Sequence, residues 1–309
     1  MLGHFLATPD EFSTHIRRMS GELIINIAYG IDVLSGDDPY IALAEAGAQA
    51  GSDATIPGKF LVDSFAILKH VPDWFPSASF KRQAKEWRKT AHAAPNVPFA
   101  ESKRLIELGV APQSFTGACL QDLNENGPTY YDEYTIKGAA GTAYLAGSDT
   151  MVSALCSFIL VMLANLAAQQ RAQLEIDLVT SGGMRLTDFD DKEALPYTSA
   201  IVEEVFRWQP VAPIGVPHFL GVEDEYRGYR LPANSIVVGN IWAMLHNEIM
   251  DLYPEPYAFN PERFLLDGKP NPHVRDPQAT FGFGRRVCPG RYVAASSVFI
   301  SVASILATF

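Results

Sequence analysis

The amino-acid sequence predicts a mainly α-helical fold with a small β-sheet late in the chain, an α+β protein organised as a single domain over residues 1–309. Apolar residues recur at helical spacing through most of the chain up to residue 208. The amino-acid composition then changes, since residues 211–239 are rich in Pro, Gly, Val and Tyr, which is typical of short strands and turns. With 48% hydrophobic residues, a chain of 309 residues is long enough to bury a sizeable core.

Helical segments are expected in succession before residue 210. The second ends before the aromatic run at residues 74–75, the third is basic and amphipathic, and the fifth is expected as two helices joined around Asn165. These segments cover residues 9–33, 40–70, 80–93, 99–124, 132–177 and 187–208. The apolar face of the first consists of Phe12, Ile16, Met19, Leu23 and Ile27.

The remaining segments complete the prediction. Residues 229–238 are interpreted as strand, turn and strand, and residues 250–290 as a proline-rich loop. The last twenty residues are expected to form a helix.

Charge and cysteine content exclude several classes of protein. The net charge of −11 argues against a nucleic-acid partner, which would need a basic surface. Three cysteines far apart in the chain predict neither a disulfide framework nor a zinc site. Residues 150–170 and 292–309 are uncharged and long enough to cross a bilayer, but their Ser, Ala and Asn content favours buried helices, so no membrane span is expected in this chain.

The loop before the last helix carries the clearest motif. Residues 281–290 read Phe-Gly-Phe-Gly-Arg-Arg-Val-Cys-Pro-Gly and fit the pattern F-x-x-G-x-R-x-C-x-G. This pattern resembles the haem-binding signature of the cytochrome P450 superfamily, and a chance match in such a chain is roughly a one-in-ten-thousand event. Gly282 and Gly284 permit a tight loop, and Pro289 is suited to a first helical position, which would place Cys288 at a helix start that favours an anionic sulfur.

The resemblance implies a role for each residue of this loop. Cys288 would be the axial ligand of the iron of haem b, Arg286 would meet a haem propionate, and Phe281 would pack against the porphyrin. Gly290 would let the backbone approach the sulfur closely, and Gly284, in the tight loop, would also belong to the cofactor-binding residues. A lone cysteine is otherwise a buried inert thiol, which is the interpretation kept for Cys119 and Cys156.

A second motif lies inside the long apolar segment. Ala-Gly-Ser-Asp-Thr at residues 146–150 resembles the oxygen-activation motif [A/G]-G-x-[D/E]-T, in which the glycine lets the helix approach the haem. Asp149 and Thr150 would then be catalytic residues that relay protons to bound oxygen. The alternative is a glycine kink with Thr150 bonded back to its own helix. Met151 departs from the family pattern, which usually has a second hydroxyl there.

Three further positions resemble the family and occur in its order. Glu204 and Arg207 resemble the E-x-x-R pair, and residues 261–264 resemble the PERF motif, so Arg263 would complete a buried Glu–Arg–Arg network. An isolated E-x-x-R is ordinarily a surface pair that contributes about 0.2–0.5 kcal/mol. His218 is either a propionate donor or a surface histidine, and both interpretations stay open.

The resemblance implies a haem-thiolate monooxygenase that uses O2, a small apolar substrate and electrons from NADPH through a reductase. The thiolate would favour cleavage of the O–O bond. Arg285, Arg286 and Arg291 would either help to dock an acidic face of the reductase or have a structural role. Apolar residues expected to line a substrate pocket are Ala139, Ala143, Val211, Ala212 and Ile214.

Other classes of protein remain as alternatives. A non-catalytic haem-binding protein or pseudoenzyme would keep Cys288 but would not need Asp149 and Thr150. A helical membrane protein would use the two apolar stretches but would leave the cysteine loop unexplained. Serine hydrolases, P-loop proteins and zincins are excluded because their motifs are absent from the sequence.

The resemblance covers only about the C-terminal three-fifths of a family member, most similar in style to fungal microsomal members. We therefore expect a fragment without the family's membrane anchor, proximal Trp-x-x-x-Arg helix and final sheet, and with Leu166 where a proline usually ends the long helix. A full-length member would sit on the cytosolic face of the endoplasmic reticulum membrane, whereas this chain would be cytoplasmic. By itself it is not expected to be a working enzyme.

Overall fold

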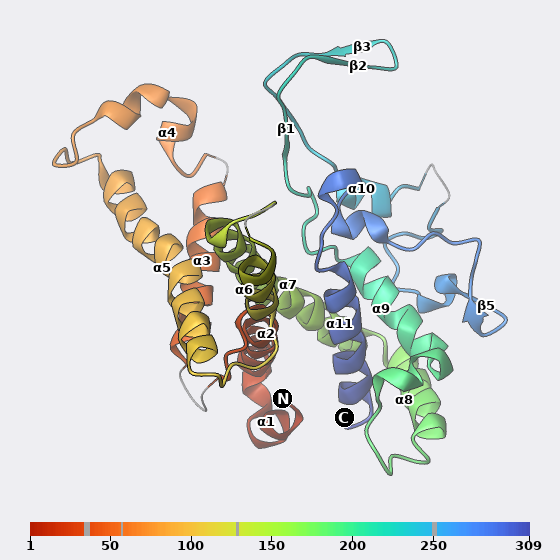
Figure 1. The fold of residues 1–309 in the computed structure, drawn as a ribbon. Helices are drawn as coiled ribbons and strands as arrows, with labels where there is room; N and C mark the ends of the chain where they lie inside the picture. The colour runs from red at the N-terminus through yellow and green to blue at the C-terminus, as the bar shows by residue number, and fades with distance from the viewer. Residues whose placement is uncertain (34–37, 57, 128–129, 249–251) are drawn as a thin grey trace. The chain divides into compact units, whose positions relative to one another are not determined.

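The computed structural model describes all residues except 34–37, 57, 128–129 and 249–251. Its internal contacts divide the chain into two compact units, one comprising Met1 and Gly3–Val152 and the other Leu2 and Ser153–Phe309. The long helix α7 (Glu133–Ala164) runs from one unit into the other (Figure 1). The mainly helical class with small antiparallel sheets is confirmed, and the single domain stays a prediction.

Helices dominate the described part of the first unit (Figure 1). Besides the first part of α7, its elements are α1 (Leu2–Ala7), η1 (Pro9–Glu11), α2 (Phe12–Tyr29), α3 (Pro39–Thr55), α4 (Leu61–Ser64), η2 (Ala66–His70), α5 (Ser79–Glu107) and α6 (Phe115–Asn126). The segment expected as one helix over residues 40–70 is therefore wrong in detail, because it is divided among α3, α4 and η2.

The prediction of separate helices over residues 80–93 and 99–124 is wrong at their junction, because helix α5 runs unbroken through Pro95 and Pro98. A proline inside a helix removes a backbone donor and normally kinks or ends it. Here the Asn96 side chain donates to the His92 carbonyl at 2.5 Å, and Pro95 packs so closely on Gly141 of α7 that an added Cβ would lie 2.6 Å away. Tertiary packing therefore overrides the local preference.

The core of the first unit is built by α2, α5, α6 and α7. Helix α2 buries Ile16 and Ile24. Its buried face is rotated from the predicted one, as shown by Ile27, which was expected to be buried but is 40% exposed. Ser20 lies on the buried face, with its hydroxyl donating to the Gly147 carbonyl at 3.2 Å, a satisfied polar group that an apolar pattern does not register. The buried cluster contains Ile24, Ile25, Ala28, Tyr29, Ile31, Ala44, Phe99, Leu120, Ile136, Ala140, Tyr144 and Met151.

The second unit combines helices with short strands. Helix α7 ends at Ala164 and α8 begins at Leu166, so the predicted break at Asn165 is confirmed, as is the final helix. Its other helical elements are η3 (Phe189–Ala194), α9 (Pro196–Trp208), α10 (Ile241–Leu245), η4 (Pro261–Phe264), η5 (Gln278–Phe281), η6 (Gly284–Arg286) and α11 (Arg291–Leu306), while α8 ends at Val179.

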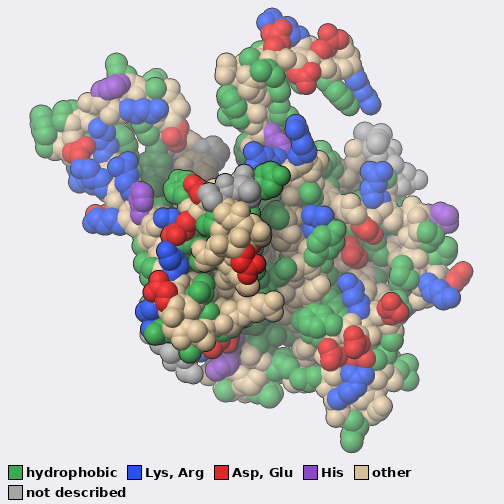
Figure 2. Space-filling view, in the orientation of Figure 1, with side chains coloured by type: hydrophobic (Ala, Val, Ile, Leu, Met, Phe, Trp, Pro, Cys, Tyr) green, Lys and Arg blue, Asp and Glu red, His purple; other side chains and the backbone are tan. Residues whose placement is uncertain are grey.

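The strands form three separate two-stranded antiparallel sheets. They are β1 (His218–Leu220) with β4 (Ser235–Val237), β2 (Asp224–Tyr226) with β3 (Tyr229–Leu231), and β5 (Leu265–Leu266) with β6 (Lys269–Pro270). The predicted strand, turn and strand at 229–238 are present, but the two strands are not partners, because β3 pairs with β2 and β4 with β1. Figure 2 shows acidic, basic and apolar side chains mixed over the exposed β2–β3 hairpin.

Among the described helices, α7 alone is long and apolar enough to cross a membrane, by length and composition. Of its most apolar window, 44% is buried inside the protein. The apolar helix α11 has 16 residues.

Candidate functional site

The cysteine loop closes on itself through backbone hydrogen bonds. The Cys288 N–H donates to the Phe281 carbonyl at 2.7 Å, and the Val287 N–H donates to the Gly284 carbonyl at 3.2 Å. Gly282 and Gly284 have φ angles of +83° and +54°, in a region that side chains with a Cβ strongly disfavour. The two glycines are therefore what allows this loop to turn back so that Cys288 faces Phe281.

The start of the final helix is tied to the cysteine. Helix α11 begins at Arg291 with Gly290 as its N-cap, so the prediction that Pro289 is the first helical residue is wrong. Pro289 instead lies in the turn before the helix, because the backbone of Gly290 (ψ 2°) has not yet reached helical geometry. The Arg291 N–H and guanidinium donate to the Cys288 carbonyl at 3.4 and 3.1 Å.

The Cys288 thiol is half-buried and not in a disulfide. A Cβ added at Gly290 would lie 3.8 Å from its sulfur, and one added at Gly284 would meet no atom within 4 Å. Gly284 therefore faces open space, whereas Gly290 lies so close to the cysteine that a side chain there would touch the sulfur. Among the described residues, no group of three or more His, Cys, Asp and Glu side chains could hold a metal ion.

Aromatic contacts join the loop to helix α9. The ring of Phe281 lies edge-on to Phe206 with centroids 5.3 Å apart. Phe283 packs against the backbone of Gly239, where an added Cβ would lie 2.8 Å from the ring. Phe281 is half-buried, so one part of its ring is held by α9 while another part stays accessible.

The side chains expected to meet the propionates or the reductase fall into two groups. Arg285 and Arg286 are exposed, as is His218 on β1, and within the described residues none of the three side chains has a hydrogen-bond or ion-pair partner. Arg291 differs, because it also donates to the Tyr292 hydroxyl at 3.0 Å and stacks over that ring. Arg291 is therefore occupied within the protein.

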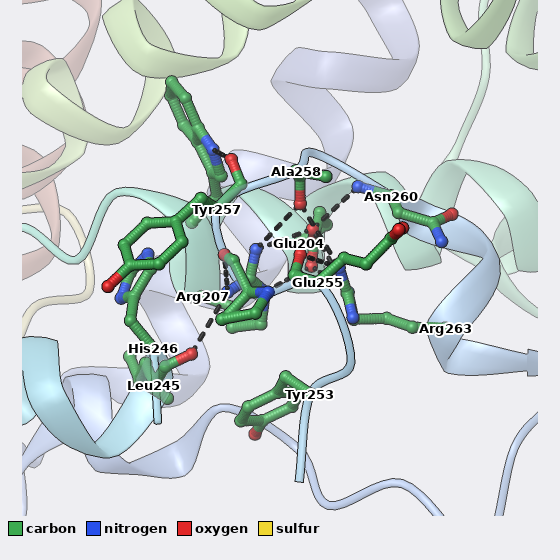
Figure 3. Close-up of polar contacts among 12 residues, drawn as sticks. Glu204, Arg207, Leu245, His246, Tyr253, Glu255, Tyr257, Ala258, Asn260 and Arg263 are labelled. Atoms are coloured by element: carbon green, nitrogen blue, oxygen red, sulfur yellow. Dashed lines mark hydrogen bonds and ion pairs between the residues drawn. The ribbon is translucent and has the colours of Figure 1, made fainter. Parts of the chain in front are cut away.

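The predicted Glu–Arg–Arg network is confirmed, and it is fully enclosed (Figure 3). Arg207 Nε lies 2.7 Å from Glu204 Oε2, and Arg263 Nε reaches both oxygens of Glu204 at 3.2 and 3.1 Å. Glu204 and Arg207 are completely buried, and Arg263 is 8% exposed. Burial holds the pKa of Arg263 below its usual value, against the opposing effect of Glu204.

Backbone groups complete this network. Arg207 donates to the carbonyls of Leu245, Pro256 and Ala258, and Arg263 donates to those of Pro254, Glu255 and Ala258. The Asn260 N–H donates to Glu204 Oε1 at 2.8 Å. The two guanidinium groups thus fix the course of residues 254–260, which have little regular structure of their own.

Asp149 and Thr150 lie on α7 within the first unit. Thr150 Oγ1 donates to the Ala146 carbonyl at 2.9 Å, which is the back-bonded arrangement considered as the alternative for this motif. Asp149 Oδ1 accepts from Arg17 of α2 at 2.9 Å, and Arg17 Nε lies 3.6 Å from Glu45. Gly147 packs against Ile24 of α2, and an added Cβ would lie 2.8 Å from that side chain. The approach of this helix to a haem stays a prediction.

One face of α7 is exposed and lined by small side chains. Thr150 lies on this face with Ala139, Ala143 and Ala146, and Asp149 lies at its edge. Of the other predicted pocket residues, all in the second unit, Val211 and Ala212 are half-buried and Ile214 is 58% exposed.

Comparison with known proteins identifies the family of the chain. A family model described as Cytochrome P450 matches residues 8–309. The chain belongs to the cytochrome P450 family. It is 43% identical over its whole length to a cytochrome P450 monooxygenase of Armillaria gallica and 42% identical to tryptamine 4-monooxygenase of Psilocybe cyanescens. It is 46% identical over 93% of its length to cytochrome P450 monooxygenase 98 of Postia placenta.

The chain spans only part of these relatives. It covers 60% of the Armillaria protein, 61% of the Psilocybe protein and 55% of the Postia protein.

Proposed function

We propose that the protein is a haem-thiolate monooxygenase that inserts one oxygen atom of O2 into a small apolar organic substrate. The cysteine loop carries this proposal, because two glycines with positive φ, a free half-buried thiol and a helix start come together at Cys288. The open space at Gly284, and the absence of a side chain at Gly290 beside the sulfur, suit a flat cofactor bound at Cys288.

Cys288 would hold the iron of haem b. The ring of Phe281, which α9 positions through Phe206, would pack against the porphyrin. Arg286 and His218 suit propionate groups, since both are cationic or polar side chains without partners among the described residues. When bound, the haem would supply O2 activation, and thiolate ligation favours O–O cleavage.

Proton delivery would be the task of Thr150 and Asp149. The Thr150 hydroxyl donates to its own helix, which leaves its oxygen lone pairs free to accept from a water molecule on the exposed face. The Asp149 carboxylate, held by Arg17, lies at the edge of that face and can exchange protons with solvent. A non-catalytic haem protein would need neither group, so the presence of both residues in the motif supports the monooxygenase.

Electrons would come from NADPH through a membrane-bound reductase, with the protein on the cytosolic face of the endoplasmic reticulum. Arg285 offers an exposed positive charge for an acidic face of that reductase, whereas the Arg286 guanidinium is assigned to a haem propionate. Arg291 is excluded from this role, because its guanidinium is used within the protein.

The test of the proposal is the spectrum of the reduced protein with carbon monoxide. We expect the red-shifted band of thiolate ligation in the purified, haem-loaded protein and in the matched control Cys119→Ser. We expect Cys288→Ser to lose it. A band that survives Cys288→Ser shows that the ligand is another residue.

Proton delivery has a separate test. In a version of the protein that spans the full length of its relatives, Thr150→Ala should raise the amount of peroxide released per NADPH consumed with a turned-over substrate. Thr142→Ala is the matched control, since Thr142 is also exposed on α7 and donates to the carbonyl four residues earlier, at 2.8 Å. Equal coupling in the two variants removes Thr150 from the mechanism.

A further inference from the structure

The helix that carries most of the buried ion-pair network, α9, is not capped by its own sequence. Its N-cap residue, Leu195, has an apolar side chain, and Pro196 at the first helical position has no N–H. The hydrogen bonds of the helix itself begin with the Ser199 N–H, which donates to the Leu195 carbonyl at 3.0 Å. The N–H groups of Tyr197 and Thr198 therefore need acceptors from outside the helix.

A carboxylate of the neighbouring helix α8 supplies both acceptors (Figure 1). Glu175 Oε1 accepts from the Tyr197 N–H at 2.8 Å. Its Oε2 accepts from the Thr198 N–H and from the Thr198 hydroxyl, each at 2.8 Å. Tyr197 and Thr198 are buried, so solvent does not replace these bonds. Both oxygens of Glu175 are therefore committed to the start of α9, where the positive pole of the helix favours an anion.

A second side chain of α8 contacts the same region. Arg171 lies one turn before Glu175, and its guanidinium stacks 4.1 Å from the centroid of the Tyr197 ring. The same guanidinium pairs with Glu262 of η4, the residue before Arg263. The side chains of Arg171 and Glu262 are 50% and 47% exposed, so this ion pair adds little energy of its own. Glu175 is therefore the main tie between α8 and α9.

We infer that Glu175 is a positioning residue for the cysteine loop. Arg207 holds α9 near its C-terminal end, and Glu175 holds it at its N-terminal end. Without the second tie the helix could shift along its axis, and a shift of one residue, about 1.5 Å, would displace Phe206 from the ring of Phe281. The Phe281 carbonyl accepts from the Cys288 N–H, so the position of α9 bears on the thiolate.

This inference rests on the proposed function, because its readout is the bond between the thiolate and haem. The test compares two isosteric substitutions of a capping carboxylate, in haem-loaded protein that spans the full length of its relatives. Glu175→Gln removes the charge and turns one acceptor into a donor. The matched control is Asp38→Asn at the start of α3, because Asp38 accepts from the N–H groups of Tyr40 and Ile41 at 2.8 and 3.2 Å.

The readout is the ratio of the unshifted to the red-shifted band in the spectrum of the reduced protein with carbon monoxide. We expect Glu175→Gln to raise this ratio about fivefold over that of Asp38→Asn, an effect of the size of one lost helix cap. Both variants should lose thermal stability, because each loses a cap, but only Glu175→Gln should change the spectrum. Thr198→Val removes the hydroxyl bond alone and should raise the ratio about twofold.

Equal ratios in Glu175→Gln and Asp38→Asn overturn the inference. If Glu175→Gln does not fold, Thr198→Val decides, and a ratio equal to that of the unsubstituted protein overturns it. The unsubstituted protein keeps the two proposals apart. If it lacks the red-shifted band, the proposed function fails and the inference fails with it, whereas a band that every variant keeps contradicts only the positioning role of Glu175.

Discussion

Replacement of Glu204 by Gln tests how much the buried network holds the second unit together. Glu204 is the sole carboxylate of the network and accepts from both Arg207 and Arg263, with the Asn260 N–H as a further donor. Glutamine has nearly the same shape, so little packing changes. The substitution leaves two buried guanidinium groups without a counter-charge and turns one acceptor oxygen into a donor that faces them.

The expected loss of unfolding free energy is about 3–5 kcal/mol, the range for breaking a buried ion pair by removing one partner. Because domains are stable by only about 5–15 kcal/mol, this is a large fraction. For a unit of this size it corresponds to a fall of about 10 °C in Tm, measured by circular dichroism.

The chain offers a matched control in Glu101→Gln. Glu101 and Arg104 have the same E-x-x-R spacing and the same two-pronged geometry, at 2.8 and 2.7 Å, but they lie at the surface of α5. The surface substitution should change stability by about 0.2–0.5 kcal/mol. If Glu204→Gln destabilises the protein no more than Glu101→Gln, the reasoning from burial is refuted.

Three further predictions follow from the described contacts. Burial, together with the Asp276 carboxylate, raises the pKa of Glu203 from 4.5 to about 7, so the native state holds this proton more tightly than the unfolded chain. Stability should therefore be greatest below pH 4.5 for this group and fall as pH rises through about 7. Glu203→Gln should flatten that part of the Tm–pH curve, and an unchanged curve contradicts the assignment. A double-mutant cycle on Arg17→Gln and Asp149→Asn should give a coupling of about 0.2–1 kcal/mol in thermal unfolding, since both side chains are partly exposed; a coupling near zero means that the pair does not hold Asp149 in solution. Gly284→Ala and Gly109→Ala both place a Cβ at positive φ in open space and should each cost about 1–2 kcal/mol, but haem retention should fall only for Gly284→Ala.

Local patterns predicted the helices where their limits are encoded locally. The break at Asn165 and the final helix are examples, since both follow from changes in composition within a few residues. The prediction failed at Pro95 and Pro98 because what preserves α5 is the contact with Gly141, more than forty residues away along the chain. It gave no partners for the strands, because β4 pairs with β1 across the β2–β3 hairpin that lies between them in the chain.

The residues of the candidate site were likewise predictable only where a local motif contains them. The motif of the cysteine loop identified Cys288, and the positive φ angles of Gly282 and Gly284 follow from that motif. The partner of Asp149 could not be predicted, since Arg17 is 132 residues away and carries no motif of its own. The sequence analysis also missed Phe206 and Asn260. For Asn260 a local signal existed, because Asn-Pro-Glu is a helix-capping sequence and the Asn260 side chain caps η4.

Phe206 and Arg207 explain why a network that is distant in sequence from Cys288 bears on the cysteine loop. They are consecutive on α9, so their side chains leave the helix in different directions. Arg207 is anchored through five hydrogen bonds to Glu204 and to three carbonyls, which fixes the rotation of the helix about its axis. That rotation directs Phe206 against Phe281, the residue whose carbonyl accepts from the Cys288 N–H. The buried ion pair therefore acts on the cysteine through one packed ring and one backbone hydrogen bond, without touching the sulfur.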